Sequence, residues 1–459
     1  MVEKFLSRTV FTSQEDYIRN FRIRVPADFN FAYDVVDAYA AEEPDKKALL
    51  WTDDRGGEIQ FTFADMKRET DRTASYFQSL GIGRGDMVML ILKRRYEFWF
   101  SILALHKLGA VAIPATHLLT RKDVVYRCNM AGIKAIVAAG EPVITGHIAA
   151  AMPESPTTKL LISVGPEVPE GFLDFHEGIR HAAPFVRPQH VNTNDDIMLM
   201  YFTSGTTGKP KAAELTWGNL VEASKASNRV LSGRVRGRGL WQAVLPFFHV
   251  GGFQVLVRSV CSRWPLRIYE RFDAAAVLRD AEVMHATHIS VVDKMLQDML
   301  NARPNALSQY ECVLLGGGPL NAKTVARALE AEGRVYASYG MTETSSQVAN
   351  TLITPQFTGG MRLLPGYSAR IVEPDAEGFG RLALRGPGVF GGYANARAAF
   401  TVDGFFLTGD TAALHDGCLY VRERTGDMFI SGGENVYPAE IVDALVRVPG
   451  VADAYVFGL

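Results

Sequence analysis

One short apolar run, together with the loop in which it ends, constrains this chain more than any other stretch. Residues 197–202 are apolar without interruption, and a run of that length predicts a buried β-strand. The loop that follows combines four hydroxyl side chains, two glycines, two lysines and a proline: Thr203, Ser204, Gly205, Thr206, Thr207, Gly208, Lys209, Pro210 and Lys211. Its glycines let backbone N–H groups crowd onto one concave surface, and its side chains add donors. We therefore expect the loop to bind a polyphosphate.

The spacing of this loop differs from that of a Walker A loop. Only two residues separate Gly205 from Gly208, whereas the Walker A motif has four residues at this point. Pro210 disfavours helical geometry at Lys209, so no helix is expected to begin directly after the loop. A polar surface loop without a ligand is the alternative interpretation, but the strand before it favours phosphate binding.

Length, charge and cysteine spacing limit the classes of protein to which this chain can belong. The 459 residues allow two or three lobes with sizeable cores. The 48 Lys and Arg residues nearly balance the 50 Asp and Glu residues, which leaves a net charge of −2 and no electrostatic case for nucleic acid. The four cysteines are far apart and have no metal-ligand spacing: Cys128, Cys261, Cys312 and Cys418. Scattered thiols of this kind indicate a reducing compartment.

Neither a signal peptide nor a membrane span is expected from the sequence. Residues 1–11 carry charges and lack an apolar core. The most apolar region, residues 87–114, is interrupted by charges at 93–95 and at Glu97, so it cannot cross a bilayer. A cytoplasmic protein is expected.

Helical and strand patterns alternate along most of the chain. Before residue 195, helices are predicted at 63–80, 96–108 and 124–130, and strands at 87–92, 110–114 and 135–139. Residues 141–195 are richer in proline and are expected to connect two lobes. After 197, strands are predicted at 240–248, 312–315 and 335–339, and helices at 252–260 and 291–300. Strands alternating with helices imply doubly wound parallel sheets.

The glycine-rich residues 360–426, with short strands at 369–372 and 382–385, predict a small β lobe. The fold class is therefore α/β, with two doubly wound sheets plus this β lobe. Ligands of such sheets bind outside the carboxyl ends of the strands, so the polar loops there are expected to converge.

The loop from Thr203 to Lys211 resembles the phosphate-loop signature of the adenylate-forming superfamily, which includes acyl-CoA synthetases, luciferases and peptide-synthetase adenylation domains. Those enzymes join a carboxylate to ATP, release pyrophosphate and usually pass the acyl group to a thiol. The resemblance implies a large N-terminal adenylation domain at 1–426, with subdomains at about 1–195, 196–345 and 346–426. Residues 427–459 would be a hinge and the start of a C-terminal lid.

A second motif lies at residues 339–343. By resemblance, Tyr339 contacts the adenine, Thr342 the α-phosphate and Glu343 a Mg²⁺ ion, and Gly340 and Met341 belong to the same ATP site. The chemistry agrees, because Mg²⁺ prefers few carboxylates together with phosphate oxygens and water. A turn with a solvent-facing glutamate is the alternative.

The remaining site residues also come from the resemblance. Gly316, Gly317, Gly318 and Pro319 match the adenine-side segment, and Asp410 and Arg424 match residues that hold the ribose. Asp427 matches the lid hinge, Gly432, Gly433 and Glu434 match a CoA-side loop, and His249 matches an aromatic gate near the acyl carboxylate. The expected catalytic residues are Lys209, His249, Thr342 and Glu343. Bare glycine turns and a structural histidine are the alternatives.

The resemblance leaves the acid and the acceptor open. Residues 98–116 resemble medium-chain acyl-CoA synthetases, whereas residues 290–300 and 340–348 resemble o-succinylbenzoate-CoA synthetases. Ala212 and Arg381 stand where the family usually has glycine and glutamate, and the sequence is expected to stop before the lid lysine. The expected reaction is activation of a medium-chain or aryl acid with ATP and Mg²⁺, then transfer to CoA. A carrier-protein acceptor, a catalytically weak nucleotide-binding protein and a homodimer stay open.

Overall fold

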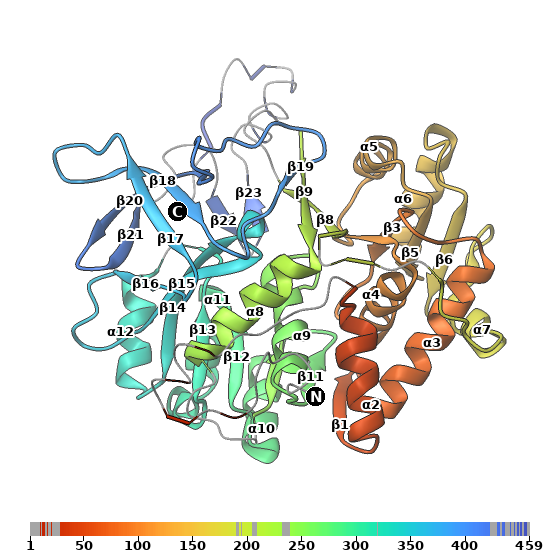
Figure 1. Cartoon of the computed structure of the whole chain (residues 1–459), viewed down its shortest axis with the longest axis horizontal. Helices are drawn as coiled ribbons and strands as arrows, with labels where there is room; N and C mark the ends of the chain where they lie inside the picture. Colours follow the sequence, from red (N-terminus) through yellow and green to blue (C-terminus); the bar gives the residue numbers. More distant parts are fainter. Residues whose placement is uncertain are drawn as a thin grey trace.

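Two lobes, each built on one large β-sheet, lie side by side in this computed structural model (Figure 1). The structure describes residues 28–189, 192–193, 195–203, 209–231, 239–318 and 320–422, with isolated positions nearer each end. No helix among these residues is both long and apolar enough to cross a membrane.

The first lobe, at the right of Figure 1, contains an eight-stranded sheet in the order β19-β9-β8-β4-β3-β5-β6-β7. Its strands are β3 (Met87–Ile91), β4 (Val111–Pro114), β5 (Ala135–Ala139), β6 (Leu160–Val164), β7 (Leu173–Asp174), β8 (Ile197–Thr203), β9 (Lys211–Thr216) and β19 (Gly392–Tyr393). Its helices are α3 (Phe63–Ser79), α4 (Tyr96–Leu108), α5 (Arg121–Ala131), α6 (Pro142–Ala151) and α7 (Phe175–Arg180). Strands β3 to β8 pair in parallel, while β9 pairs antiparallel with both β8 and β19.

The second lobe contains a thirteen-stranded sheet in the order β17-β18-β20-β21-β16-β15-β14-β13-β12-β10-β11-β1-β2. Its strands are β1 (Lys47–Thr52), β2 (Glu58–Thr62), β10 (Trp241–Ala243), β11 (Leu266–Tyr269), β12 (His288–Val291), β13 (Cys312–Leu315), β14 (Val335–Met341), β15 (Ser346–Leu352), β16 (Met361–Leu363), β17 (Ser368–Val372), β18 (Gly380–Arg385), β20 (Phe406–His415) and β21 (Cys418–Arg422). Its helices are α8 (Trp217–Leu231), α9 (Val250–Cys261), α10 (Ala274–Met284), α11 (Asp293–Ala302) and α12 (Ala322–Glu330). The predicted α/β fold is confirmed.

Helix α4 joins the two lobes. It begins after the extended Arg95 and ends at Gly109, whose φ of 72° suits a residue without a side chain. Twelve of its thirteen residues are buried. Phe98 packs against Phe247 at 5.2 Å between ring centroids, and Trp99 against Phe253 at 6.1 Å. A helix that is buried on nearly every side in this way is expected in the interior of a large chain.

Several sequence predictions need correction. Residues 141–195 are more than a connection, because α6, β6 and α7 lie there and β6 extends the first sheet. The strand predicted at 240–248 is only β10, and Val291 ends β12, so helix α11 starts later than predicted. No helix follows the phosphate loop, as predicted from Pro210, because β9 begins at Lys211.

The two sheets also take strands from across the predicted subdomain boundaries. β1 and β2 pair into the second sheet, although they precede the first lobe in the sequence. β8 and β9, which flank the phosphate loop, belong to the first sheet, and so does the late strand β19. The predicted boundaries at about 195 and 345 therefore describe the order of the sequence and not the membership of the sheets.

Candidate active site

A sharp reversal of the chain places Thr342 and Glu343 at the end of β14. A Cβ on Gly340 would lie 2.0 Å from the carbonyl oxygen of Ser346, so only glycine fits there. Ser345 and Ser346 adopt φ values of 55° and 92°, which are uncommon for residues with side chains. Backbone strain of this kind persists where the surrounding structure fixes it, and it concentrates at functional sites.

The same strand connects to Asp410, the predicted ribose ligand. The Tyr339 hydroxyl donates a hydrogen bond of 2.5 Å to Asp410 Oδ2. Asp410 lies on β20, and its backbone N–H donates to Thr408 Oγ1 at 3.1 Å. Two predicted ATP-site residues, 71 positions apart in the sequence, are therefore in direct contact.

Glu343 connects in turn to the exit of the phosphate loop. The Tyr393 hydroxyl donates to Glu343 Oε1 at 2.6 Å. The ammonium group of Lys211 lies 5.4 Å from the centroid of the Tyr393 ring, which is within range of a cation–π contact. Lys211 begins β9, and Thr203, at the other end of the loop, donates from Oγ1 to the Lys211 carbonyl at 3.4 Å.

The glycines after β13 lie beside the strand that carries Tyr339. A Cβ on Gly316 would lie 2.5 Å from Ser338 Oγ, and Ser338 Oγ donates to the carbonyl of Leu315 at 2.9 Å. Gly317 has a φ of 80°, which favours glycine. A side chain at Gly316 would therefore displace the residue next to Tyr339.

The predicted gate also lies near the phosphate strand. Tyr201, on β8, donates from its hydroxyl to the carbonyl of Phe247 at 3.1 Å. His249 follows and immediately precedes α9, with its ring 4.7 Å from that of Phe248. The exposed Lys209 precedes β9. The described parts of four predicted motifs thus lie at the same end of the two sheets.

Some predicted site residues lie outside the described residues. They are Ser204, Gly205, Thr206, Thr207 and Gly208 of the phosphate loop, together with Pro319, Arg424, Asp427, Gly432 and Gly433. Glu434 belongs to the short strand β23 (Glu434–Val436), and its side chain is not described.

A buried cation lies just beyond this reversal of the chain. Arg258, on α9, is 1% exposed, and its Nη2 donates to Ser346 Oγ at 3.5 Å. Among the described residues, no carboxylate lies within ion-pair distance of Arg258, and its Nε has no hydrogen-bond acceptor. Burial lowers the pKa of the guanidinium to about 10.

Polar side chains from α8 and α9 hold the backbone around Ser346. Gln254 Nε2 donates to the carbonyl of Ser345 at 2.8 Å, and the Ser224 hydroxyl donates to Gln254 Oε1 at 2.5 Å. Gln347 bonds to Ser227. This buried network fixes the strand that follows Glu343, beside the Arg258 side chain.

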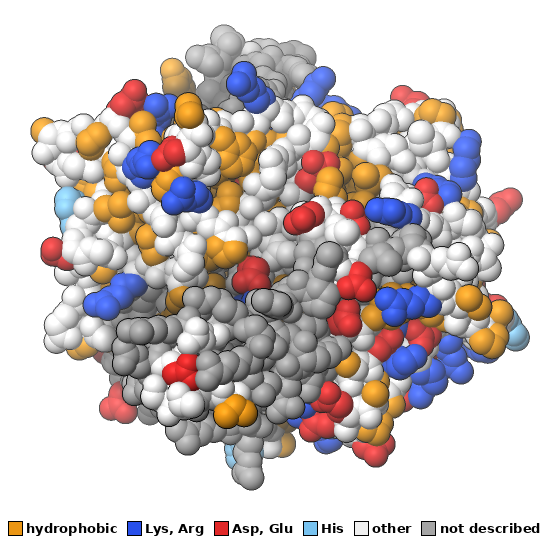
Figure 2. Space-filling view, in the orientation of Figure 1, with side chains coloured by type: hydrophobic (Ala, Val, Ile, Leu, Met, Phe, Trp, Pro, Cys, Tyr) orange, Lys and Arg blue, Asp and Glu red, His pale blue; other side chains and the backbone are white. Residues whose placement is uncertain are grey.

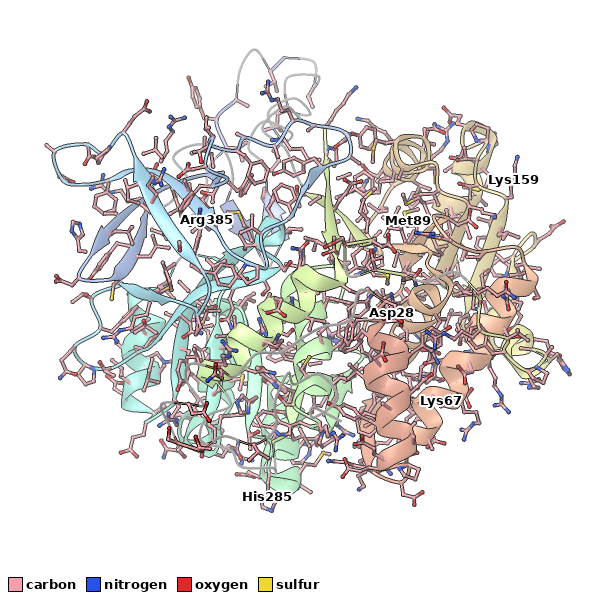
Figure 3. The ribbon with its side chains drawn as sticks, in the orientation of Figure 1. Asp28, Lys67, Met89, Lys159, His285 and Arg385 are labelled. Carbon is pink, nitrogen blue, oxygen red and sulfur yellow. The ribbon has the colours of Figure 1, made fainter. Side chains whose placement is uncertain are left out.

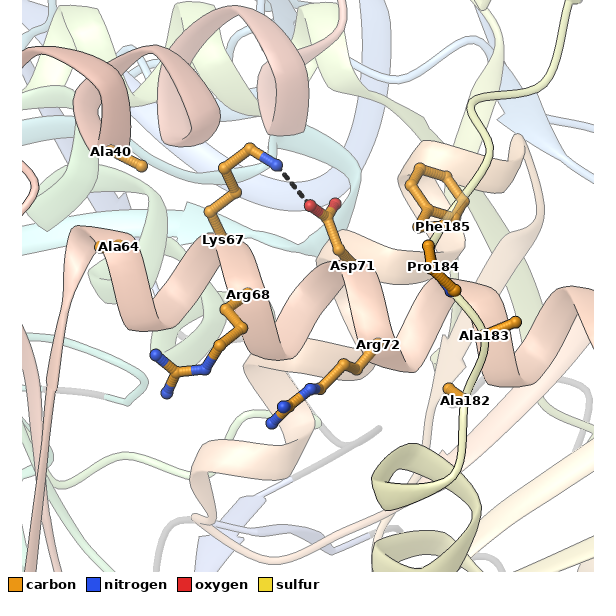
Figure 4. A pocket seen from close by; sticks show the side chains of 10 residues that line it. All are labelled: Ala40, Ala64, Lys67, Arg68, Asp71, Arg72, Ala182, Ala183, Pro184 and Phe185. Carbon is orange, nitrogen blue, oxygen red and sulfur yellow. Dashed lines mark hydrogen bonds and ion pairs between the residues drawn. The ribbon is translucent and has the colours of Figure 1, made fainter.

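A hollow of about 470 Å³ lies elsewhere and lacks the chemistry of an active site. It is lined by Ala40, Ala64, Lys67, Arg68, Asp71, Arg72, Ala182, Ala183, Pro184 and Phe185 (Figure 4). Lys67 pairs with Asp71, Arg68 with Asp65, and Arg72 with Glu69, so the charges are compensated. Figure 3 shows Lys67, which lines the hollow, in the first lobe and Arg385, at the end of β18, in the second. β18 pairs with β20, the strand that carries Asp410, so the hollow is remote from Asp410.

Charged side chains of both signs occur on the face shown in Figure 2. Blue and red side chains alternate over its described part, without a broad field of one sign. This is the pattern expected for a net charge of −2.

The sequence did not predict two residues of the site, Tyr393 and Arg258. Tyr393 sits in a Gly-Gly-Tyr stretch that carries no motif for chemistry, and only the pairing of β19 with β9 brings it to Glu343. Arg258 looks like one charge on an apolar helix, and only its burial shows that it is unusual. A cation inside the run 250–261, whose other residues are uncharged and mostly apolar, is the one sequence signal for it.

The comparisons with known proteins agree with this geometry. A family model described as AMP-binding enzyme matches residues 36–394. A 2-succinylbenzoate--CoA ligase from Bacillus mycoides is 31% identical over 432 residues, which are 90% of this chain and 84% of that protein. The enzyme of the same name from Enterococcus faecalis is 29% identical and covers 91% and 83% of the two chains.

Solved structures show the same relationship. The o-succinylbenzoate coenzyme A synthetase from Bacillus subtilis in complex with ATP and magnesium ion has a TM-score of 0.75 at 27% identity, covering 92% of this chain and 86% of that one. A double mutant of that enzyme with a product analogue has a TM-score of 0.80, with 27% identity and coverage of 92% and 85%. The predicted use of ATP, Mg²⁺ and CoA agrees with these names. The chain therefore belongs to the AMP-binding enzymes, as an AMP-forming acid–thiol ligase of that family.

Proposed function

We propose that this chain activates an aryl acid that carries a second carboxylate, and that it then transfers the acyl group to CoA. Arg258 carries the proposal for the acid. A buried guanidinium without a carboxylate partner is costly unless a ligand compensates it. The relatives named for 2-succinylbenzoate, an aryl acid with two carboxylates, support the same class of substrate.

Arg258 and His249, the proposed gate at the reacting carboxylate, are nine residues apart on and just before the same helix. Nine residues of α-helix span about 13 Å along the axis and make about two and a half turns, so the two side chains leave opposite faces. The assignment of the second carboxylate to Arg258 therefore rests on its lack of a carboxylate partner among the described residues and on its contact with Ser346, and not on this spacing.

We propose that the contact chain from Lys211 through Tyr393 to Glu343, and from Tyr339 to Asp410, lines the ATP site. Lys209, Lys211 and the loop between Thr203 and Lys211 would hold the phosphates. Asp410 and Arg424 would hold the ribose, and Tyr339, Gly340, Met341 and the segment from Gly316 to Pro319 would lie along the adenine. These roles follow the resemblance and the contacts described above.

In this site the reacting carboxylate would attack the α-phosphorus of ATP in line, forming acyl-AMP and releasing pyrophosphate. Thr342 and the lysines at the phosphate loop would stabilise charge on the phosphoryl oxygens. Glu343 beside a phosphate loop is a donor set that suits Mg²⁺, which when bound would neutralise phosphate charge. The CoA thiol would then displace AMP, with Gly432, Gly433 and Glu434 on its path and Asp427 as the lid hinge.

The remaining parts of the proposal concern organisation. Residues 1–426 would form the adenylation domain, with a hinge and lid segment from 427. All four cysteines are free, which suits a reducing cytoplasm. A homodimer is proposed as the state in solution, and light scattering of the purified chain would measure its mass.

A panel of acids tests the proposed substrate. Pyrophosphate exchange should be fastest with aryl acids that carry a second carboxylate, slower with the matching aryl monoacids, and slowest with medium-chain fatty acids. Mass spectrometry of the products with CoA or a carrier protein identifies the acceptor. Equal rates for the aryl diacid and its monoacid would refute the role of the second carboxylate.

Replacing the proposed metal carboxylate tests the site itself. Glu343→Gln should lower Mg²⁺-dependent pyrophosphate exchange by about 10²–10³, the usual cost of losing one well-placed group that stabilises charge. The thermal midpoint should stay close to that of the wild type, because the amide keeps the size of the side chain. Unchanged exchange in the folded variant would rule out the metal role.

A further inference from the structure

The segment from Phe390 to Asn395, here called the strap, touches both Glu343 and the phosphate-loop exit. The Phe390 N–H donates to the Glu343 carbonyl at 2.8 Å, and the Tyr393 hydroxyl donates to Glu343 Oε1 at 2.6 Å. The backbone and the side chain of Glu343 are therefore both held by this one segment.

The other end of the strap closes the base of the phosphate loop. Gly392 and Tyr393 pair antiparallel with Glu214 and Ala213 of β9. The Asn395 side chain accepts from the Ala212 N–H at 2.9 Å and donates to the Pro210 carbonyl at 2.9 Å. These bonds fix the backbone on either side of Lys211.

We propose that Tyr393 is a positioning residue for Glu343, and that the strap keeps this carboxylate in register with the phosphate loop. The inference rests on the proposed metal role of Glu343. A hydroxyl that donates to one carboxylate oxygen fixes the rotation of the group, and so fixes the direction in which the second oxygen binds a cation. Tyr393 also carries the Lys211 ammonium on its ring face, so one side chain sets the spacing between a metal carboxylate and a phosphate-binding cation.

The ring and the hydroxyl of Tyr393 can be tested apart. Tyr393→Phe removes the hydroxyl that bonds to Glu343. It keeps the ring that Lys211 faces and that packs 4.8 Å from the Phe390 ring. Tyr126→Phe is the matched control, because the Tyr126 hydroxyl also bonds at the loop exit: it donates to the Pro210 carbonyl at 3.0 Å and accepts from the Asn395 amide of the strap at 3.1 Å. The control therefore removes a hydroxyl that contacts the strap while the bond between Tyr393 and Glu343 is kept.

The experiment titrates Mg²⁺ in pyrophosphate exchange and Mn²⁺ in binding to the ATP-saturated protein, followed by electron paramagnetic resonance. Tyr393→Phe should raise the half-saturating concentration of both metals about tenfold, as is usual when a partner of a metal-binding carboxylate is removed. Its Kd for ATP in EDTA should change much less than either half-saturating metal concentration. Tyr126→Phe should leave the half-saturating Mg²⁺ unchanged.

The controls separate the inference from the function on which it rests. If Glu343→Gln shifts the metal dependence and Tyr393→Phe does not, the positioning role is wrong and the metal role stands. If neither variant shifts it, the metal role of Glu343 fails, and the inference fails with it. A Tyr393→Phe protein that loses thermal stability and ATP affinity in EDTA, with metal dependence unchanged, has lost only a structural bond and also overturns the inference.

Discussion

The buried cations of the two lobes are compensated in two opposite ways. In the first lobe, Lys107 on α4 is fully buried and bonds to Asp37 at 2.8 Å and to Asp71 at 2.6 Å. In the second lobe, Arg258 on α9 is equally buried and has no carboxylate partner among the described residues. A third buried cation, Arg267, follows the first pattern, because it pairs with Asp280 at 2.7 Å.

This difference separates structural charge from charge that is available to a ligand. Lys107 and its two carboxylates compensate each other within the chain, so nothing further is needed to stabilise them. Arg258 keeps its charge against the cost of burial, which lowers its pKa; among the described side chains, its guanidinium contacts the Ser346 hydroxyl at 3.5 Å. Its neighbours lie on the strand that follows Glu343, so the uncompensated charge is next to the proposed site.

Removing the paired cation should have the largest effect on stability. Lys107→Met leaves Asp37 and Asp71 without their shared cation in a largely buried position, and should lower the free energy of unfolding by about 3–5 kcal/mol. Pyrophosphate exchange per folded molecule should not change, because Lys107, Asp71 and Asp37 lie on α4, on α3 and in residues 32–37, and not on the strands that carry the candidate site.

Urea titration measures this loss, and Lys67→Met is its matched control. Lys67 also pairs with Asp71, but its side chain is 44% exposed, so its loss should cost at most about 1 kcal/mol. Equal losses in the two variants would contradict the view that burial decides the value of these pairs.

Protonation of His288, which would create a second unpaired charge in the second lobe, should have a smaller effect on stability. Burial lowers the pKa of His288 from 6.5 to about 4. Its Nε2–H donates to the Leu231 carbonyl at 3.1 Å, and its ring lies 4.8 Å from Trp241 and 4.9 Å from Trp264. The unfolded chain therefore binds a proton that the folded chain excludes, and stability should fall as the pH drops from about 6.5 towards 4.

The expected contribution of His288 is about 2 kcal/mol lost by pH 5, out of roughly 3 kcal/mol in all. Unfolding followed by tryptophan fluorescence at several pH values measures it. His288→Gln should be less stable at pH 7 but should lose less stability between pH 6.5 and 5. Parallel pH profiles for the two proteins would show that His288 does not titrate in this way.

Local sequence patterns predicted many helices and strands of the first lobe. They did not predict which strands that are distant in the sequence pair with one another. The bounds of α4 and β5 match the prediction, because an apolar helix ending at a glycine and a short apolar strand are local signals. The sequence pattern does not predict α6, because the prolines of residues 141–195 indicate a connection. Pro142 nevertheless occupies the first turn of α6, where proline is favoured. The pairing of β1 with β11 joins residues more than 200 positions apart and leaves no local signal.

The candidate site divides in the same way. Motifs indicated Tyr339, Glu343 and Asp410, and the structure brings Tyr339 and Asp410 into contact. The sequence does not indicate the other two residues. Tyr393 belongs to the site only because β19 pairs with β9, and Arg258 stands out only because no carboxylate lies beside it among the described residues. Pairing and compensation are properties of the folded chain, so one sequence without its fold does not reveal them.

The unpaired cation itself should be the least important of these charges for stability. Arg258→Met removes a buried guanidinium that has no ion pair within the described part of the chain, and the methionine keeps most of the apolar contacts of the side chain. Relief of desolvation and loss of the Ser346 contact should nearly offset each other, so the free energy of unfolding should change by about 1 kcal/mol or less.

The effect of the same substitution on substrate choice should be clear. In Arg258→Met, KM for an aryl acid with a second carboxylate should rise about tenfold or more, because a charge-assisted bond in a desolvated position is lost. KM for the matching aryl monoacid should stay the same or fall, so that the preference between the two acids disappears. Arg258→Lys is the informative control, since it keeps the charge but not the planar fork, and should retain part of the preference. A loss of stability as large as that of Lys107→Met, with the preference intact, would show that Arg258 is structural after all.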